Sequence, residues 1–372
     1  MISNSVILRQ RSSTLTGLIK RSFAAGARGK FYGSSDSLLP TYLPKPGSGN
    51  LKKISVLPGS KIGPMLVDSV EKCIKHCDIN LNLEKFGDVK EYDEDMLEKL
   101  SNSDAILRGP FFEGKDSKGD IFLPKQLDLY AYVVHAFSIP GITSRHDNID
   151  IVVIRENSEG EYSTIEHEVL PGIVESIKVT TKEKSIRIAE YAFEYAMLSN
   201  RAKVTCVHKA NIIKKGDGEF LDAAREVSDR YPRIKLEEMI IDATCMNLIQ
   251  HPDSFDVILV PNLYGAIIGN VVAGLVGGAG IAPGASIGKT VGMFEQGARC
   301  AGTDLIKTQN ANPTAFILSA CMMLRYLNLP YYADSIQEGV FRTIRSGKNL
   351  TPDLGGTANT EEFTKEVIRN IY

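Results

Sequence analysis

Short apolar runs alternate with amphipathic stretches along this chain of 372 residues. Runs such as Ile54–Leu57, Val204–Val207 and Phe255–Val260 predict buried strands. Between the strands, apolar positions recur at three and four residues and predict helices. The first predicted helix would bury Val67, Val70, Cys73, Ile74 and Cys77. This alternation predicts an α/β fold with a largely parallel sheet.

Local signals predict where individual helices begin and end. The turn Pro58–Pro64 precedes the first helix, and its last residue suits the first helical position. Thr180 and Glu183 are spaced as a capping box. The helix that follows is expected to bury Ile186, Ala189, Phe193, Ala196 and Met197. Two further helices are expected at Ala315–Tyr326 and Glu361–Ile371.

Residues 266–285 form a nearly continuous stretch of apolar and small side chains. Its length alone would suit a membrane span. Asn270 and the pair Gly277-Gly278 interrupt it, so we expect a short buried helix that starts after Gly265 and then a glycine-rich turn. The sequence therefore predicts no membrane span.

The N-terminal segment differs in composition from the rest of the chain. Residues 1–35 contain no acidic side chain, several Arg and Lys residues and many Ser, Thr and Ala residues. This composition is typical of a mitochondrial transit peptide and predicts a protein of the mitochondrial matrix. A disordered basic tail is the alternative. In either case we expect the folded part to begin near Lys52.

The overall composition excludes some classes of partner. With 43% apolar and 24% charged residues and a formal net charge of −2, the chain gives no reason to expect nucleic acid or an anionic membrane as a partner. Cys73 and Cys77 lie four residues apart beside His76. They are either metal ligands or two thiols that face the core in a reducing compartment.

Residues 261–270 read P-N-L-Y-G-A-I-I-G-N and follow a predicted strand. Open α/β sheets bind ligands at the carboxyl ends of their strands. The segment resembles the P-N-L-Y-G-D-I-x-x-D signature of the NAD-dependent isocitrate and isopropylmalate dehydrogenase family, in which the two Asp residues hold a divalent metal. Ala266 and Asn270 stand at those positions here. The substitution removes two carboxylates of the kind that a hard cation prefers.

Two other motifs of that family are kept. Residues 154–162 resemble I-R-E-N-T-E-G-E-Y, which implies that Tyr162 is the acid of a decarboxylation step. Residues 207–212 resemble the H-K-A-N-I segment, which implies that Lys209 is the catalytic lysine; taken alone, it would be an exposed lysine at a strand end. Asp242 stands at the position of the family's third metal carboxylate. Taken alone, it would equally suit a helix N-cap.

The family's substrate clamp is partly lost. Residues 123–134 resemble L-R-K-x-L-D-L-Y-A-N-V-R, and its two arginine positions are Pro124 and Val134. The resemblance implies that a third arginine is kept as Arg145. Because a guanidinium matches a carboxylate with two hydrogen bonds, each lost charge-assisted bond weakens the binding of a tricarboxylate by roughly 1.5–3 kcal/mol.

The adenine loop also departs from the family. Residues 294–305 stand where F-E-P-V-H-G-S-A-P-D-I is expected, and the His-Gly pair that packs on adenine is absent. The resemblance assigns nucleotide contacts to Arg299, Asp304 and Asn312. This loop resembles that of regulatory subunits of the NAD-dependent isocitrate dehydrogenase of mitochondria, where an effector such as AMP or ADP replaces NAD. A reshaped surface turn is the alternative.

The resemblance covers residues 52–372 and implies a two-domain α/β fold that is not a Rossmann fold. The implied large domain, on the nucleotide side, is formed by both ends of the chain, 51–129 and 281–372. The implied small domain, 130–280, holds the substrate and metal side and the dimer interface. The transit peptide would occupy 1–35.

The resemblance also implies a reaction of the tricarboxylic acid cycle, in which isocitrate and NAD give 2-oxoglutarate, CO₂ and NADH with Mg²⁺ or Mn²⁺. In this family each site is shared across a dimer; Lys209 and Asp242 come from the neighbouring subunit, whereas Tyr162 serves the chain's own site. We therefore predict a regulatory subunit that completes the site of a catalytic partner in a hetero-oligomer and binds AMP or ADP and citrate. A self-sufficient 2-hydroxy acid dehydrogenase and a non-enzymatic binding protein on a retired enzyme fold remain as alternatives.

Overall fold

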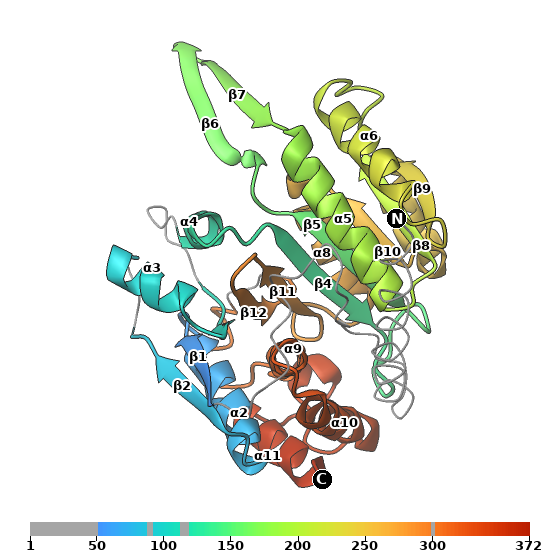
Figure 1. Cartoon of the computed structure of the whole chain (residues 1–372). Helices are drawn as coiled ribbons and strands as arrows, with labels where there is room; N and C mark the ends of the chain where they lie inside the picture. Colours follow the sequence, from blue (N-terminus) through green and yellow to red (C-terminus); the bar gives the residue numbers. More distant parts are fainter. Residues whose placement is uncertain (1–50, 88–91, 112–118, 299–301) are drawn as a thin grey trace, which may run out of the picture.

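The computed structural model describes residues 51–87, 92–111, 119–298 and 302–372. The predicted transit peptide and Arg299 lie outside these ranges. The strands are β1 (Lys52–Leu57), β2 (Leu81–Lys85), β3 (Ala105–Arg108), β4 (Ala131–Phe137), β5 (Asp150–Glu156), β6 (Gly160–Leu170), β7 (Ile173–Val179), β8 (Lys203–His208), β9 (Lys235–Ile240), β10 (Val257–Val260), β11 (Pro283–Ile287) and β12 (Gly292–Gln296). The strands β6 and β7 form a separate hairpin that projects from one end of the molecule (Figure 1).

The other strands form one sheet in the order β2-β1-β3-β12-β11-β4-β5-β10-β8-β9. This sheet is antiparallel only in its middle, where β11 pairs with β12 and β4, and β4 pairs with β5. Every other neighbouring pair in it is parallel, which confirms the predicted α/β fold. All residues of β3, β10 and β11 are buried, as expected for strands with both faces covered.

Helices cover both faces of the sheet, with α5 in front of it and α8 behind it in Figure 1. The helices are α2 (Gly63–His76), α3 (Glu94–Ser101), α4 (Gly119–Gln126), α5 (Lys182–Leu198), α6 (Gly216–Ser228), α7 (Ile241–Gln250), α8 (Asn262–Leu275), α9 (Thr314–Tyr326), α10 (Pro330–Ser346) and α11 (Thr360–Asn370), with short 3-10 helices η1 (Pro252–Ser254) and η2 (Pro352–Leu354). Every residue of α9 except Arg325 is buried, so this helix lies at the centre of one half of the core.

Segments from the two ends of the chain lie side by side. The helix α11 packs on α2, and the Thr364 hydroxyl donates a hydrogen bond to Ser69 Oγ at 2.9 Å. In the sheet, β12 pairs with β3. This arrangement agrees with the family fold that the sequence resembles.

The first part of α5 differs from its prediction. The capping residue is Thr181 and not Thr180, because the Thr181 hydroxyl accepts a hydrogen bond from Lys184 N and contacts the buried Glu159 at 3.0 Å. Met197, expected to be buried, is 43% exposed. Ala189, Phe193 and Ala196 are buried as predicted, and Ile186 is half-buried.

The helix α8 begins earlier than predicted. It starts at Asn262 because Pro261 is already extended and its carbonyl accepts a hydrogen bond from Gly265 N at 2.8 Å. It ends at Leu275, before the glycine-rich turn, as predicted. Within the ranges above, no helix is both long and apolar enough to cross a membrane.

The two N-terminal cysteines face the core. Cys73 is buried, Cys77 is half-buried, and burial raises the pKa of both thiols. Among the residues with a described position, no three His, Cys, Asp or Glu side chains are placed to hold a metal ion. The structure thus favours two packed thiols over a metal site at this helix.

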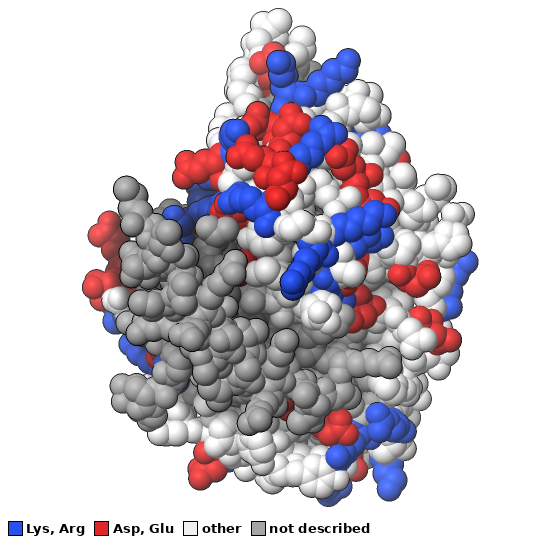
Figure 2. Space-filling model, turned by 45° about the vertical axis from the view of Figure 1, so that its right-hand side comes forward, with Lys and Arg blue, Asp and Glu red and all other residues white. Residues whose placement is uncertain are grey.

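Acidic and basic side chains are interspersed on the face of the molecule that Figure 2 shows. Acidic groups gather in the upper part of this view, with basic groups among them. A mixed surface of this kind agrees with the formal net charge of −2.

Candidate functional site

Two residues of the predicted site lie together at the end of β8. The strand ends at His208, Lys209 follows it directly, and Asp242 lies in the first turn of α7. The Lys209 ammonium donates a hydrogen bond to the Asp242 carboxylate. The two side chains are 23% and 62% exposed. The N-cap of α7 is Ile240, so the alternative assignment of Asp242 as an N-cap is wrong.

A buried carboxylate fixes the backbone of Lys209. Asp217, in the first turn of α6, is 1% exposed. It accepts hydrogen bonds from Lys209 N at 2.6 Å and from Lys178 Nζ at 2.7 Å. Burial lowers the pKa of Lys178, but its hydrogen bond to Asp217 and the charges of Asp217 and Glu161 outweigh burial and raise that pKa. Lys178 therefore stays charged and joins the base of the β6–β7 hairpin to the strand end that carries Lys209.

Tyr162 lies against an arginine that the sequence analysis did not single out. Arg155, near the carboxyl end of β5, is 4% exposed, and its guanidinium carbon lies 4.7 Å from the centre of the Tyr162 ring. Asn262 Oδ1 accepts hydrogen bonds from Arg155 Nε at 3.0 Å and Nη2 at 2.6 Å. A Cβ atom at Gly265 would lie 2.5 Å from Arg155 Cγ, so the glycine of the P-N-L-Y-G motif makes room for this side chain.

The sequence around Arg155 contains a pattern that could have identified this residue. It is a basic residue at the end of a strand whose preceding residues, 151–154, are all apolar, and it lies inside the motif that also contains Tyr162. A buried charge at a strand end is unusual unless it binds something or is paired. Arg145, the arginine that the sequence analysis chose, is instead exposed on the turn between β4 and β5.

At the two positions where the family's clamp motif has arginine, this chain has buried side chains that pack inside the protein. Val134 is 1% exposed in β4. A Cβ atom at Gly269 of α8 would lie 3.6 Å from Val134 Cγ2, so the helix packs directly on this valine. Pro124 lies within α4. These positions therefore offer no cation to a substrate carboxylate.

The two residues that replace the metal pair lie one turn apart on α8. Asn270 is exposed and donates a hydrogen bond from Nδ2 to the carbonyl of Ala266 at 2.8 Å. Ala266 has no oxygen ligand in its side chain. The donors present on this face of α8 therefore do not fit a divalent cation, which needs several oxygen ligands with carboxylate charge.

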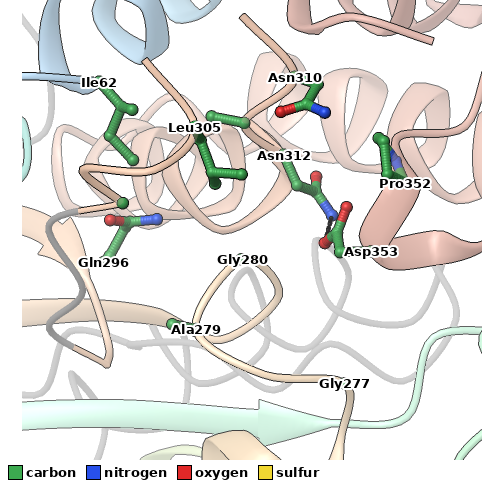
Figure 3. A pocket seen from close by; sticks show the side chains of 12 residues that line it. Ile62, Gly277, Ala279, Gly280, Gln296, Leu305, Asn310, Asn312, Pro352 and Asp353 are labelled. Carbon is green, nitrogen blue, oxygen red and sulfur yellow. Dashed lines mark hydrogen bonds between the residues drawn. The ribbon is translucent and has the colours of Figure 1, made fainter. Parts of the chain in front are cut away.

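A separate cavity of about 210 Å³ opens where the turn after α8 meets β12, the segment after residue 301 and η2 (Figure 3). Asn312 is buried on its wall, donates a hydrogen bond from Nδ2 to Asp353 Oδ2 at 2.8 Å and accepts one from Thr314 N at 2.9 Å. The cavity is lined by Ile62, Gly277, Ala279, Gly280, Gln296, Gly302, Leu305, Asn310, Ala311, Asn312, Pro352 and Asp353. Asp304, the other described residue of the predicted nucleotide site, is exposed and lies beside the lining residue Leu305.

Comparison with known proteins places these features in one family. Residues 53–367 match the family described as isocitrate/isopropylmalate dehydrogenase. The chain belongs to this family. It is 44% identical to the mitochondrial isocitrate dehydrogenase [NAD] regulatory subunit 2 of Arabidopsis thaliana, over 98% of this chain and 99% of the relative. It is also 44% identical to the mitochondrial isocitrate dehydrogenase [NAD] subunit beta of Bos taurus, over 86% of each chain.

The fold of the family is also recognised in solved structures. The crystal structure of isocitrate dehydrogenase from Methylococcus capsulatus superposes with a TM-score of 0.81 at 33% identity, over 86% of this chain and 99% of that one. The family assignment allows the motif positions of this chain to be compared with those expected for the family. This chain has Lys209, Asp242 and Tyr162 at three positions where the sequence analysis expects the family's site residues, and Ala266 and Asn270 where it expects the metal pair.

Proposed function

We propose that this chain is a regulatory subunit of the mitochondrial NAD-dependent isocitrate dehydrogenase, which converts isocitrate and NAD to 2-oxoglutarate, CO₂ and NADH. One contrast carries the proposal: Lys209 and Asp242 are kept and paired, whereas Ala266 and Asn270 replace the metal carboxylates. The names of the relatives support both the subunit class and the location in mitochondria, where the matrix is the expected compartment.

The kept pair would serve a neighbouring catalytic subunit. A divalent metal bound in that site, Mg²⁺ or Mn²⁺, would supply Lewis-acid chemistry to the substrate. Asp242 would add one carboxylate to the partner's metal ligands, and Lys209 would take or return the proton of the substrate hydroxyl. The buried Asp217 would hold Lys209 in place through its backbone N–H group.

The surface beside this pair supports a subunit contact. Large apolar side chains are exposed on α7, which also carries Asp242, and on α8, which contacts α7; Met246 is 55%, Ile249 42% and Ile267 49% exposed. Contiguous exposed apolar side chains mark contact surfaces more often than free ones. A catalytic homologue that covers this surface would bring its own site to Lys209.

The chain's own site would bind effectors. Arg155, with the Tyr162 ring against it, is a buried cation suited to a carboxylate ligand such as citrate. Arg145 lies on the turn at the opposite end of β5 from Arg155, so this geometry does not support the expected role of Arg145 at the same ligand. The cavity at Asn312 would take AMP or ADP, with Asp304 and Arg299 as further nucleotide contacts. NAD and the divalent metal would remain with the catalytic partner.

The arrangement of strands supports a proposed division into two domains. The strands β4, β5, β8, β9 and β10 and the β6–β7 hairpin come from residues 130–280, which would form the small domain. The strands β1, β2, β3, β11 and β12 come from 51–129 and 281–372, which would form the large domain. The antiparallel pairing of β11 with β4 would join the two.

The proposed function is tested by following NADH formation from isocitrate with Mg²⁺. The chain without residues 1–35 is assayed alone, and then after co-expression with its catalytic homologue. The expected result is no turnover alone, with a rate in the mixture that responds to citrate and AMP or ADP. Turnover by this chain alone would establish the self-sufficient dehydrogenase instead. Failure to co-purify with any catalytic homologue would favour a non-enzymatic binding protein that keeps the enzyme fold without its activity.

A further inference from the structure

Gln296, the last residue of β12, has a side chain whose hydrogen-bonding capacity is unmet. It is 8% exposed, and its Oε1 atom is buried with no hydrogen-bond partner among the described residues. Figure 3 shows this amide at the edge of the cavity, across from Asn312 and Asp353. A buried polar atom without a partner costs about 1–3 kcal/mol, so a side chain of this kind calls for an explanation.

The backbone of Gln296 is held firmly. Its carbonyl accepts a hydrogen bond from the Tyr132 hydroxyl at 2.8 Å, and the same hydroxyl donates to the Gly297 carbonyl at 3.1 Å. Gly297 N donates to Ala282 O at 2.9 Å, and Gln296 is paired with Pro283 of β11. The amide therefore projects from a fixed point of the sheet. Because the backbone is already ordered, only the side-chain torsions of Gln296 lose freedom when it binds a ligand.

The other polar groups of the cavity are already engaged with each other. Asn312 donates to Asp353 Oδ2 at 2.8 Å, and Thr351 donates to Asp353 Oδ1 at 2.5 Å. Ile62 and Leu305 supply apolar surface on the same wall. A volume of about 210 Å³ lies below the roughly 300–1,000 Å³ of pockets that enclose whole drug-sized ligands. The space thus suits one flat ring system with a polar edge, and not a whole dinucleotide.

We propose that Gln296 is a specificity-determining residue of this cavity and that its amide binds the edge of an adenine base. A primary amide offers a donor and an acceptor side by side, which matches the 6-amino group and N7 of adenine. The family motif F-E-P-V-H-G has proline at this position, which has neither group. The inference rests on the proposed binding of a nucleotide effector and adds to it the residue that selects the base.

The test compares the binding of AMP and IMP to the chain without residues 1–35 by isothermal titration calorimetry. IMP carries an oxo group in place of the 6-amino group, so at the N7 edge it presents two acceptors and cannot pair with both groups of the amide. The native chain is expected to bind AMP about tenfold more tightly than IMP, and tenfold corresponds to 1.4 kcal/mol. Gln296→Met keeps the length of the side chain without its amide, and is expected to bind both nucleotides with the affinity of IMP.

Two further variants separate recognition from folding. Gln296→Glu keeps the acceptor for the 6-amino group but loses the donor to the ring nitrogen, so it should bind AMP more weakly than the native chain while still preferring it to IMP. Asn310→Ala also alters the cavity wall, but the Asn310 side chain is already engaged with the Thr308 hydroxyl at 2.5 Å, so the preference should remain. The thermal unfolding midpoint of each variant confirms that it is folded.

The results distinguish this inference from the proposed function. Equal binding of AMP and IMP by the native chain, or an AMP preference that survives unchanged in Gln296→Met, overturns the role of Gln296. It does so even if the mixture with the catalytic homologue still forms NADH in response to AMP. A mixture whose rate does not depend on this chain overturns the regulatory function itself. A native chain that binds neither nucleotide removes both the nucleotide site and the role of Gln296.

Discussion

Lys209 and Asp242 form an ion pair across 33 residues of sequence, between the end of β8 and the first turn of α7. Both side chains are partly exposed, and the pair lies beside the apolar surface of α7 and α8. A lysine and a carboxylate that bind each other at such a surface are available to a neighbouring subunit. The chain's own α8 offers no carboxylate for them to complete.

The first prediction concerns the donated lysine. In a complex with the catalytic homologue, Lys209→Ala in this chain should lower turnover by about 100-fold or more, because general acid–base groups contribute roughly 10²–10⁴ in rate. Turnover is measured as NADH formation from saturating isocitrate. Lys214→Ala, which removes an exposed lysine from the same segment, is the control and should leave turnover unchanged. Equal rates for the two variants rule out the donor role.

The second prediction concerns the buried carboxylate behind Lys209. Asp217→Ala should lower the free energy of unfolding by about 3 kcal/mol or more, because it leaves Lys178 without its buried partner. Asp222→Ala removes an ion pair with Arg225 in which the acidic side chain is 70% exposed, and should cost no more than about 1 kcal/mol. Urea unfolding of the native chain and both variants gives the comparison. Similar losses for the two would show that Asp217 does not fix this region.

The sequence allowed the fold to be predicted well because it depends on long, strongly patterned segments. The runs at Val204–Val207 and Phe255–Val260 became β8 and β10, with shifts of one or two residues at their ends. Helix starts were harder. Thr180 and Thr181 both suit a cap, and the choice between them depends on Glu159, which only the fold brings to Thr181.

Individual residues of the candidate site could be predicted from the motifs that contain them, but their pairing in space could not. Lys209 and Asp242 lie in separate motifs, and the structure brings them together. The arginine beside Tyr162 was missed although four apolar residues precede Arg155, because the family resemblance was aligned on Arg145, which is exposed. The role of Gln296 could not be predicted from the sequence either, because it depends on a buried oxygen without a hydrogen-bond partner among the described residues and not on the residue type.

The third prediction concerns the missing metal pair. The double variant Ala266→Asp, Asn270→Asp places two carboxylates one turn apart on an exposed part of α8, so it should bind Mn²⁺ measurably more tightly than the native chain. Isothermal titration with Mn²⁺ gives both affinities. Leu263→Asp combined with Ile267→Asp adds the same charge at the same spacing on the exposed face of α8 and serves as the control. Tight Mn²⁺ binding by the native chain would contradict the loss of the site.

The last prediction concerns pH. His135 is 3% exposed, its Nε2 lies 2.7 Å from Asp150 Oδ1, and Arg201 donates to the same Asp150 oxygen at 2.6 Å. Burial lowers the pKa of His135, and the charges of Arg201 and Arg325 lower it further, although Asp150 opposes them. The folded chain therefore keeps this imidazole neutral at a pH where the unfolded chain, with a histidine pKa of about 6.5, binds a proton.

The sign of the effect follows from this difference. Where the unfolded state binds more protons, stability rises with pH. The contribution of His135 is thus fully present above about pH 6.5 and is lost as the pH falls toward the lowered pKa, by up to about 1.4 kcal/mol per pH unit. Urea unfolding at pH 7 and pH 5.5 should show this loss in the native chain and less of it in His135→Asn. His167→Asn, which alters an exposed histidine, should keep the full loss. A pH dependence that is the same in the native chain and His135→Asn would mean that other groups cause it.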